Sequence, residues 1–333
     1  INPVFRCLAH NYMDAEAPKL NICFFDIEVE FNKEKGFADP TDPFNKVVSV
    51  ELHLSWLKKT ICLAIKPDTL TIPEAQDICK KFEDTILCTD EAELLNTFLE
   101  LIDDADVLTG WNSEGFDIPY LINRTKRVLS RSHTRKFCLW EKYPKEKTVV
   151  KYGKEQQTYV LFGRVHLDYL LLYQKYTYHE MHSYSLDAIG EYELGERKVD
   201  YEGTLDQLYN KDFETFIAYN RQDVDLMVRM DKKLQFIDLA NVLAHSNTVL
   251  LATTIPHRLK DRDFSLSGEK NLNSYESSPG KTRFFCRTCG TQIYAKTPVR
   301  SISPQSYLQP PAAVGSQAVR HTEQTACKVC QTT

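Results

Sequence analysis

An apolar run that ends in acids, residues 20–30 (LNICFFDIEVE), constrains the fold of this chain more than any other feature. Its continuous hydrophobicity and its aromatics predict a buried strand. Because side chains alternate along a strand, Asp26 and Glu28 point to the same side, about 7 Å apart. Such carboxylates repel each other unless a cation lies between them, and oxygen ligands suit Mg²⁺ or Mn²⁺. The alternative is a strand that leaves the core and meets solvent.

The rest of the first 250 residues alternates between strand-like and helix-like patterns. Further strands are predicted at 47–52, 60–65 and 106–112, a hairpin at 147–163, and a strand followed by a helix at 164–176. Helical spacing of apolar residues predicts helices at 91–105 after a cap at Thr89 or Asp90, at 118–131, and, as the longest, at 211–245 with Asp212 near its start. This alternation predicts an α/β sheet domain over about residues 20–250.

The composition is that of a soluble globular protein. The 333 residues are 42% hydrophobic and 26% charged, with a net charge of −5. No apolar stretch is long enough for a membrane span, and the first residues do not form a secretory signal, so we expect no membrane partner and no secretion. From residue 256 onward there are 11 basic and 5 acidic residues, so the preceding part is strongly acidic. A negative body still allows DNA binding along a local basic path while acids hold metal ions.

Two further segments carry acids at positions typical of sites. In WNSEGFDIPYLINR (111–124), Asp117 lies at a loop-to-helix junction, where a helix cap is the simpler interpretation. In YNRQD, Tyr219 and Asp223 are four residues apart and share one face of a helix. Taken alone, that pair is equally compatible with an ordinary amphipathic helix.

The order of these segments is more specific than any of them alone. Asp-x-Glu, then Asn-x3-Phe-Asp, then Tyr-x3-Asp is the pattern of the three 3′–5′ exonuclease motifs of DNA polymerases. With FFDIEVEF, LTGWNSEGFDIPYLINR, HLDYLLLYQKYTY, HSYSLDAIGEYELGE and YNRQDVDLM, residues 1–254 resemble the proofreading domain of a family B DNA polymerase of the T-even-like phage type, including those of marine cyanophages. The resemblance implies an RNase H-like (DnaQ-like) α/β fold with a mixed sheet over 20–254, after an N-terminal remnant at 1–19.

The resemblance also implies two-metal hydrolysis of the 3′-terminal phosphodiester of DNA, with two Mg²⁺ or Mn²⁺ ions. Asp26 matches the ligand that bridges both metals. Glu28 and Asp223 match the remaining ligands of the metal that activates water, and Asp117 matches the carboxylate associated with the second metal. Tyr219 matches the tyrosine that orients the attacking water.

Five more residues are predicted to contact a single-stranded 3′ primer end. Asn112 and Phe116 fit the second motif, where an aromatic ring would stack on unpaired bases, although core packing of Phe116 is equally compatible. The hairpin at 147–163 matches a family hairpin that helps to separate primer from template. Its Lys147, Lys151 and Lys154 would contact phosphates, or form an exposed solubilising edge.

The polymerase motifs of the family, DxxSLYPS-like and YGDTD-like, do not occur in this sequence. We therefore expect no DNA synthesis by this chain alone, and a separate polymerase chain or a sliding clamp as a partner. The chain begins without Met, as a fragment would. One alternative function is a non-catalytic DNA-binding or polymerase-associated fragment. The phage resemblance implies the cytoplasm of an infected bacterial cell.

The C-terminal part carries four cysteines in two CxxC pairs: Cys286, Cys289, Cys327 and Cys330. The first pair lies in a knuckle-like turn, which is half of a tetrahedral Zn²⁺ site, and the second pair either completes that site or is incidental. Residues 267–296 resemble the later half of the glutathione-dependent formaldehyde-activating family, which implies a zinc-dependent carbon–sulfur lyase as a second alternative function. The upstream cysteines that this activity needs are absent from the sequence. We predict a small Cys-rich, zinc-knuckle-like β segment at 255–300 and a poorly ordered tail at 301–333. A fusion, a rearranged gene and a sequence-assembly artefact would each join two such fragments.

Overall fold

The computed structural model divides the chain into two units, Ile1–His257 and Arg258–Thr333. The residues that it describes, and to which every statement below refers, are 3–12, 15–31, 36–151, 154–177, 180–196, 203–247, 249–254, 272–278, 281–286, 292–296 and 319–320. Within these residues, no helix combines the length and the apolar character needed to cross a membrane.

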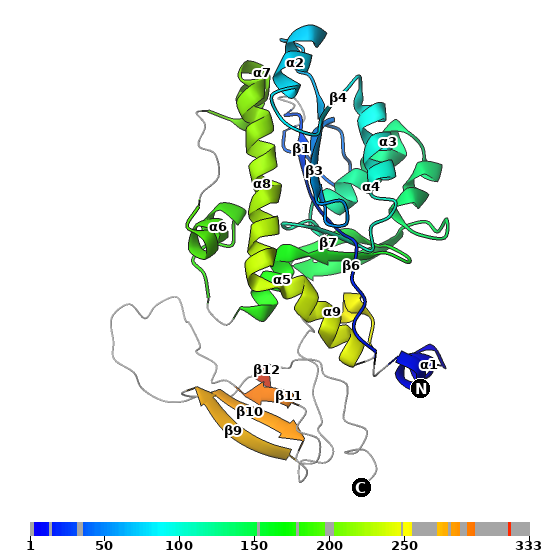
Figure 1. The fold of residues 1–333 in the computed structure, drawn as a ribbon, viewed down its shortest axis with the longest axis vertical. Coiled ribbons are helices and arrows are strands. Elements are labelled where there is room, and N and C mark those ends of the chain that lie inside the picture. Colours follow the sequence, from blue (N-terminus) through cyan, green and yellow to red (C-terminus); the bar gives the residue numbers. More distant parts are fainter. Residues whose placement is uncertain are drawn as a thin grey trace, which may run out of the picture. The chain divides into compact units, whose positions relative to one another are not determined.

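A six-stranded mixed sheet forms the centre of the first unit, which confirms the predicted α/β class (Figure 1). The strand order is β4-β3-β2-β1-β5-β8. Strands β1, β2 and β3 form an antiparallel meander, whereas β4 runs parallel to β3, and β5 and β8 run parallel to β1. The bounds are β1 Ile22–Val29, β2 Val47–Leu54, β3 Lys59–Ile65, β4 Thr85–Cys88, β5 Val107–Gly110 and β8 Val165–Asp168.

Helices cover both faces of this sheet, with α8 on one side and α3 and α4 on the other (Figure 1). Alternate residues of β1 enter different cores: Cys23, Phe25 and Ile27 pack with α3 and α4, while Phe24 packs with α5, α8 and α9. The helices of the first unit are α1 Pro3–Tyr12, α2 Ile72–Cys79, α3 Glu91–Leu101, α4 Asp117–Val128, α5 Tyr169–Tyr176, α6 Leu186–Leu194, α7 Leu205–Lys211, α8 Phe213–Leu234 and α9 Phe236–Ser246, with 3₁₀ turns at Arg131–Phe137 (η1) and Leu251–Thr254 (η2).

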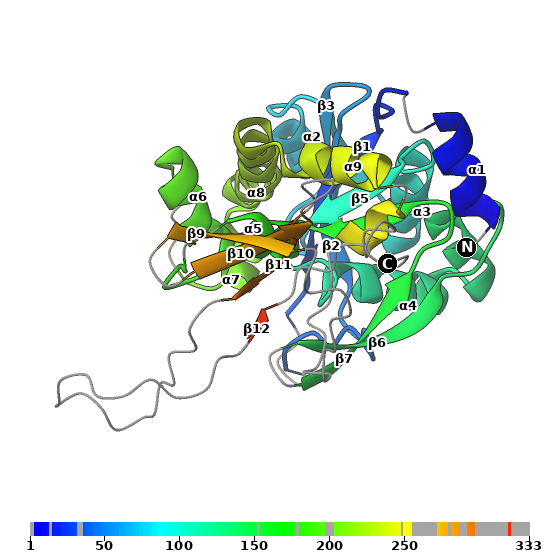
Figure 2. The same ribbon diagram turned by 90° about the horizontal axis from the view of Figure 1, so that it is seen from below.

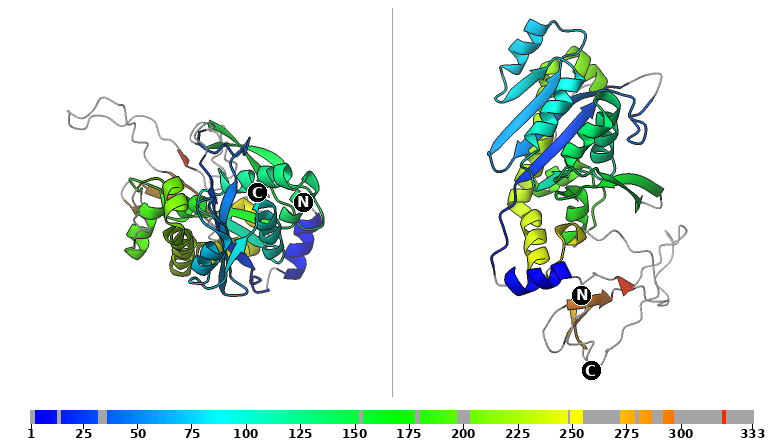
Figure 3. Two further views of the ribbon diagram at one scale, coloured as in Figure 1. Left: turned by 90° about the horizontal axis from the view of Figure 1, so that it is seen from above. Right: turned by 90° about the vertical axis from the view of Figure 1, so that its right-hand side faces the viewer.

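Side-chain caps fix where two of the predicted helices begin. Asp90, rather than Thr89, caps α3 and accepts a hydrogen bond from the N–H of Glu93 at 2.8 Å. Asp212 caps α8 by accepting from the N–H of Thr215 at 3.0 Å. The segment before β1 is held by α9, because Asn241 Nδ2 donates to the carbonyl oxygen of Pro18 at 2.7 Å; Figure 3 shows α1, in dark blue, near the yellow α9.

The prediction of one long helix over 211–245 is wrong, because the chain turns at Gln235. This residue has φ 53°, in the left-handed region that ends helices, and α9 starts immediately after it. The turn carries Phe236 and Ile237 into the core beside α5. No glycine or proline marks position 235, so the sequence pattern did not reveal the break.

A buried carboxyl at this turn makes stability depend on pH. Asp231 accepts from Tyr169 Oη at 3.0 Å, and burial raises the pKa of Asp231 to about 6, a shift that the hydrogen bond from the Ile237 N–H opposes. Because this pKa lies above the unfolded value of about 3.9, the stability that protonation contributes is complete below about pH 4 and is lost as pH rises through 6.

We therefore expect Asp231→Asn to stabilise the protein above pH 6 by about 1–3 kcal/mol and to change little near pH 4. The asparagine keeps an oxygen that can accept from Tyr169 and cannot ionise. Urea unfolding of both proteins at pH 4, 6 and 8 measures the difference. A difference in unfolding free energy that is the same at all three pH values would contradict this assignment.

The hairpin predicted at 147–163 is formed by β6 (Lys145–Lys151) and β7 (Lys154–Val160), which pair antiparallel apart from the main sheet. It lies beside α4, as Figure 2 shows, and Tyr159 Oη donates to Asn123 Oδ1 of that helix at 2.6 Å. The hairpin is thereby attached to the helix that begins at Asp117.

The second unit contains a four-stranded antiparallel sheet in the order β12-β11-β10-β9. Its strands are β9 Leu272–Ser278, β10 Lys281–Cys286, β11 Gln292–Lys296 and β12 Val319–Arg320. Cys286 is the last residue of β10, and the predicted zinc ligands Cys289, Cys327 and Cys330 lie outside the described residues.

Candidate active site

The acids of β1 lie on the face that α8 covers. Phe24 is buried on this face, and strand alternation brings Asp26 and Glu28 to the same side, half-buried, as the strand reaches its end. Strand β5 is in register with Ile22 to Phe24 and ends at Gly110, so no residue of β5 pairs with Asp26 or Glu28. Both acids therefore lie in the second half of a strand whose preceding residues, Cys23 to Phe25, are buried in the core.

Helix α8 supplies a third acid. Asp223 is buried, and one of its ligand oxygens lies within 4.8 Å of those of Asp26 and Glu28. This helix packs along β1 and β2, which explains how residues almost 200 positions apart in sequence meet. The structure thus brings together the first and third predicted motifs.

Three carboxylates this close repel one another, and the repulsion is relieved when a divalent cation is bound among them. Carboxylate oxygens are the donors preferred by Mg²⁺ and Mn²⁺, whereas softer metals prefer nitrogen and sulfur ligands. The residues present therefore fit a hard divalent cation, and the chemistry open to them is that of a metal-assisted hydrolase.

Asp117 is the first residue of α4 and is 5% exposed. It lies outside the group of three acids, but its carboxyl accepts a backbone hydrogen bond from Ile27, the residue between Asp26 and Glu28. Burial raises the pKa of Asp117 to about 7; its own backbone N–H and that of Ile27 oppose this rise, and the charge of Asp168 adds to it. The second motif therefore reaches β1 from the side opposite to α8.

Tyr219 is half-buried on α8, one turn before Asp223, and packs against the core that β2 and β3 form with α2 and α7. Asn112 adopts a left-handed backbone with φ 59° in the loop before α4. Phe116 is half-buried and stacks on Tyr120, with ring centroids 5.2 Å apart. The Phe116 ring thus has a packing partner in the fold while part of it stays accessible.

Of the three predicted hairpin lysines, only Lys147 has a side chain that the structure describes. Lys147 is about half-buried, and burial lowers its pKa while the charge of Glu114 in the second-motif loop (residues 111–116, between β5 and α4) opposes that shift. Lys147 is therefore close to the loop that leads to Asp117. Lys151 and Lys154 pair at the end of the hairpin, where only their backbone positions are described.

A fourth acid, which the sequence motifs did not predict, lies on the same face of the sheet. Glu51 of β2 is directly opposite Asp26 in the register and is 1% exposed. Burial raises its pKa to about 7, and the charge of Arg221, whose Nη1 lies 4.0 Å from Glu51 Oε1, opposes the rise. An acid inside the apolar run VVSVEL was the signal that could have revealed it.

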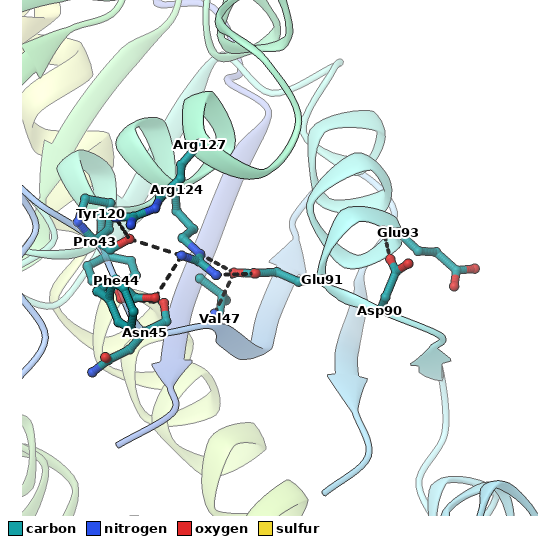
Figure 4. Close-up of polar contacts among 10 residues, drawn as sticks. All are labelled: Pro43, Phe44, Asn45, Val47, Asp90, Glu91, Glu93, Tyr120, Arg124 and Arg127. Atoms are coloured by element: carbon teal, nitrogen blue, oxygen red, sulfur yellow. Dashed lines mark hydrogen bonds and ion pairs between the residues drawn. The ribbon is translucent and has the colours of Figure 1, made fainter. Parts of the chain in front are cut away.

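A buried ion pair holds α4, and hence Asp117, against the rest of the domain (Figure 4). Arg124 donates to both carboxylate oxygens of Glu91 of α3 at 2.6 Å, and each side chain is 9% exposed. Glu91 also accepts from the N–H of Val47 at the start of β2, and Arg124 Nη1 donates to the carbonyl oxygens of Pro43 and Phe44. The pair thus links α4, α3 and the segment that leads into β2.

Residues 4–189 match the exonuclease domain of DNA polymerase family B. This span covers more than half of the chain and includes the acids of β1 and Asp117. The chain therefore belongs to that family, as its motifs predicted.

Similar proteins include phage and eukaryotic DNA polymerases. The DNA-directed DNA polymerase of Escherichia phage RB69 is 38% identical over 157 residues, which are 45% of this chain and 17% of that protein. That of Enterobacteria phage T4 is 34% identical over 133 residues, 40% of this chain and 15% of that protein. The DNA polymerase delta catalytic subunit of Drosophila melanogaster is 26% identical over 224 residues, 59% of this chain and 20% of that protein. The chain spans a fifth or less of the length of these relatives.

Proposed function

We propose that the first unit is a 3′–5′ exonuclease that removes nucleotides from the 3′ end of DNA by metal-dependent hydrolysis. The observation that carries this proposal is the group of three carboxylates formed by Asp26, Glu28 and Asp223. Membership of the exonuclease-domain family supports it. The fold that we expect for this function is RNase H-like.

Each residue has a defined part in this proposal. Asp26 would hold both cations, Glu28 and Asp223 would complete the first site, and Asp117, beside Ile27, would face the second. When bound, two divalent ions offset phosphate charge and stabilise the attacking and leaving oxygens. Tyr219, one turn from Asp223 on the same helix, would orient the water that attacks.

The substrate that fits this surface best is a single-stranded 3′ end. Phe116 offers a partly accessible ring for stacking on an unpaired base, and base stacking holds a strand without sequence preference. Lys147, near the same loop, would neutralise a phosphate, and Lys151 and Lys154 would extend this contact along the hairpin. Asn112 would bind the terminal nucleotide from the second-motif loop.

An assay with labelled oligonucleotides tests the activity and its direction. With Mg²⁺, a 5′-labelled single strand should shorten one nucleotide at a time, and a 3′-labelled strand should release labelled mononucleotide at once. Circular single-stranded DNA should remain intact and EDTA should stop the reaction. Cleavage of the circle, or loss of a 5′ label as mononucleotide, would contradict a 3′–5′ exonuclease.

Replacement of Tyr219 by phenylalanine removes only the hydroxyl. If Tyr219 orients water without binding metal, cleavage should slow by about 100- to 1,000-fold, the range typical of one positioned group. Mn²⁺ affinity, measured by calorimetric titration in the absence of DNA, should stay the same as in the wild type. A large fall in Mn²⁺ affinity would show that Tyr219 supports the metal site instead.

Three finer points complete the proposal. The domain would act beside a polymerase chain or a sliding clamp, in the cytoplasm of an infected bacterium. Strand β10 ends at Cys286 and β11 begins at Gln292, which supports a zinc-knuckle-like segment with Zn²⁺ on Cys286 and Cys289. Cys327 and Cys330 would supply the other two ligands, so about one zinc per chain is expected, and Cys289→Ser should abolish binding.

A further inference from the structure

Asp168, a buried aspartate at the end of β8, links the start of α5 to the second-motif loop, two segments that the proposed mechanism does not connect. Asp168 is 2% exposed and caps α5, with Oδ1 accepting from the N–H groups of Leu170 and Leu171 at 3.0 and 3.4 Å. The same carboxylate reaches into the second-motif loop: Oδ1 accepts from the N–H of Asn112 at 3.2 Å and Oδ2 from that of Glu114 at 3.1 Å.

The second-motif loop needs such a support because its backbone is irregular. Asn112 is in the left-handed region, which is uncommon for a residue with a side chain. The loop follows Gly110, where a Cβ atom would lie 2.6 Å from the carbonyl oxygen of Phe25, so β5 ends tightly against β1. A further side-chain contact of the loop also comes from β8, because Ser113 Oγ and His166 Nε2 are 2.8 Å apart.

We propose that Asp168 is a positioning residue of the exonuclease site: by fixing the N–H groups of Asn112 and Glu114, it sets where α4 begins and where Asp117 meets β1. This inference rests on the proposed function. Four N–H groups converge on one carboxylate, and an ionised acceptor makes such bonds roughly twice as strong as a neutral one does. The two bonds to the loop go beyond what a helix cap requires.

Two substitutions separate the cap of α5 from the support of the loop. Serine at position 168 still caps a helix, but its single short hydroxyl cannot also reach Asn112 and Glu114. Asparagine keeps the length and one oxygen, and loses the charge and the second acceptor. The matched control is Asp90→Ser, which makes the same change at the cap of α3, a helix that carries none of the proposed site residues.

Single-turnover and steady-state cleavage of a labelled single strand give the first measurement. We expect Asp168→Ser to lower kcat by about a hundredfold, the size of effect that a displacement of about 1 Å produces at a catalytic group. KM should rise by less than kcat falls, because the hairpin lysines are untouched and only Asn112 and Phe116, in the displaced loop, would weaken DNA binding. Asp168→Asn should recover part of the lost kcat, and Asp90→Ser should retain the wild-type value.

Amide hydrogen exchange gives a second measurement that does not depend on activity. In Asp168→Ser, the peptide covering 111–117 should exchange about tenfold faster, while the peptide covering the start of α5 changes less because serine still caps it. Unchanged exchange at 111–117 would overturn the inference, as would faster exchange with an unaltered kcat. If the wild-type protein does not cleave DNA, the proposed function fails, and exchange alone still decides whether Asp168 holds the loop.

Discussion

Replacement of Asp26 by alanine should reduce DNA cleavage by about a thousandfold or more. One carboxylate oxygen each of Asp26, Glu28 and Asp223 lies within 4.8 Å of the other two, and in the proposed function Asp26 is the acid that holds both cations. Loss of about 4 kcal/mol of charge stabilisation in the transition state corresponds to a thousandfold in rate. The measurement is the rate of shortening of a 5′-labelled single strand in saturating Mg²⁺ and again in Mn²⁺.

The folded structure of Asp26→Ala should be retained, because removing one of three adjacent carboxylates relieves repulsion and leaves or raises the midpoint of thermal unfolding without metal. Asp225→Ala is the matched control: Asp225 is on the same helix, two residues from Asp223, but it is exposed and pairs with Arg229 at 2.7 Å. Asp225→Ala should cleave at the wild-type rate. Equal rates for Asp26→Ala and wild type would show that the site is assigned to the wrong residues.

The strand at the centre of the fold was predictable because its pattern is set by burial on both faces. Residues 20–30 form an apolar run in which Phe24 and Phe25 enter different cores, and no other element accommodates such a run as simply. The α/β class followed from the alternation of strands and helices, and the structure confirms it. The family followed from the order of three short motifs and is confirmed by the match over residues 4–189.

What the pattern could not predict depends on tertiary contacts or on local backbone geometry. Helix α2 and strand β4 are formed by a polar stretch of the sequence that shows no clear hydrophobic period. A capping box at Thr71 and Glu74 supplies the local signal for α2, and packing of α2 against α8 stabilises it. The break at Gln235 arises from a left-handed residue without glycine. In both cases the local sequence is compatible with more than one structure, and the core selects one.

The candidate site likewise contains residues that the sequence predicted and residues that only tertiary contacts reveal. Asp26, Glu28 and Asp223 were predicted from spacing and resemblance, and the structure brings them together. Glu51 and Asp168 were not predicted, because their significance comes from register and from hydrogen bonds to distant backbone groups rather than from a motif. Sequence patterns favour residues that touch the substrate, whereas residues that hold those in place are recognised only once their partners are known.

The largest effect on stability is expected at the buried pair that holds α4. Glu91 has a side chain that is only 9% exposed, and replacing Arg124 by methionine leaves its carboxylate without a cation. The substitution also removes the donor to the carbonyl oxygens of Pro43 and Phe44. Breaking one side of a buried pair destabilises proteins by about 3–5 kcal/mol, because a charge stays buried and uncompensated. Denaturant unfolding of wild type and variant measures this loss.

Two further variants show that the loss comes from the unpaired charge. Arg127→Met, three residues further along the same helix, removes an exposed partner of Asp42 at 3.0 Å and should cost about 1 kcal/mol or less. Replacing both Glu91 and Arg124 by apolar residues of similar volume, Glu91→Leu with Arg124→Met, should recover part of the loss, since no buried charge remains. The recovery is incomplete because the N–H of Val47 still loses its acceptor. If Arg124→Met costs no more than Arg127→Met, the buried pair does not hold α4 in place, and the position of Asp117 must then depend mainly on the loop that Asp168 supports.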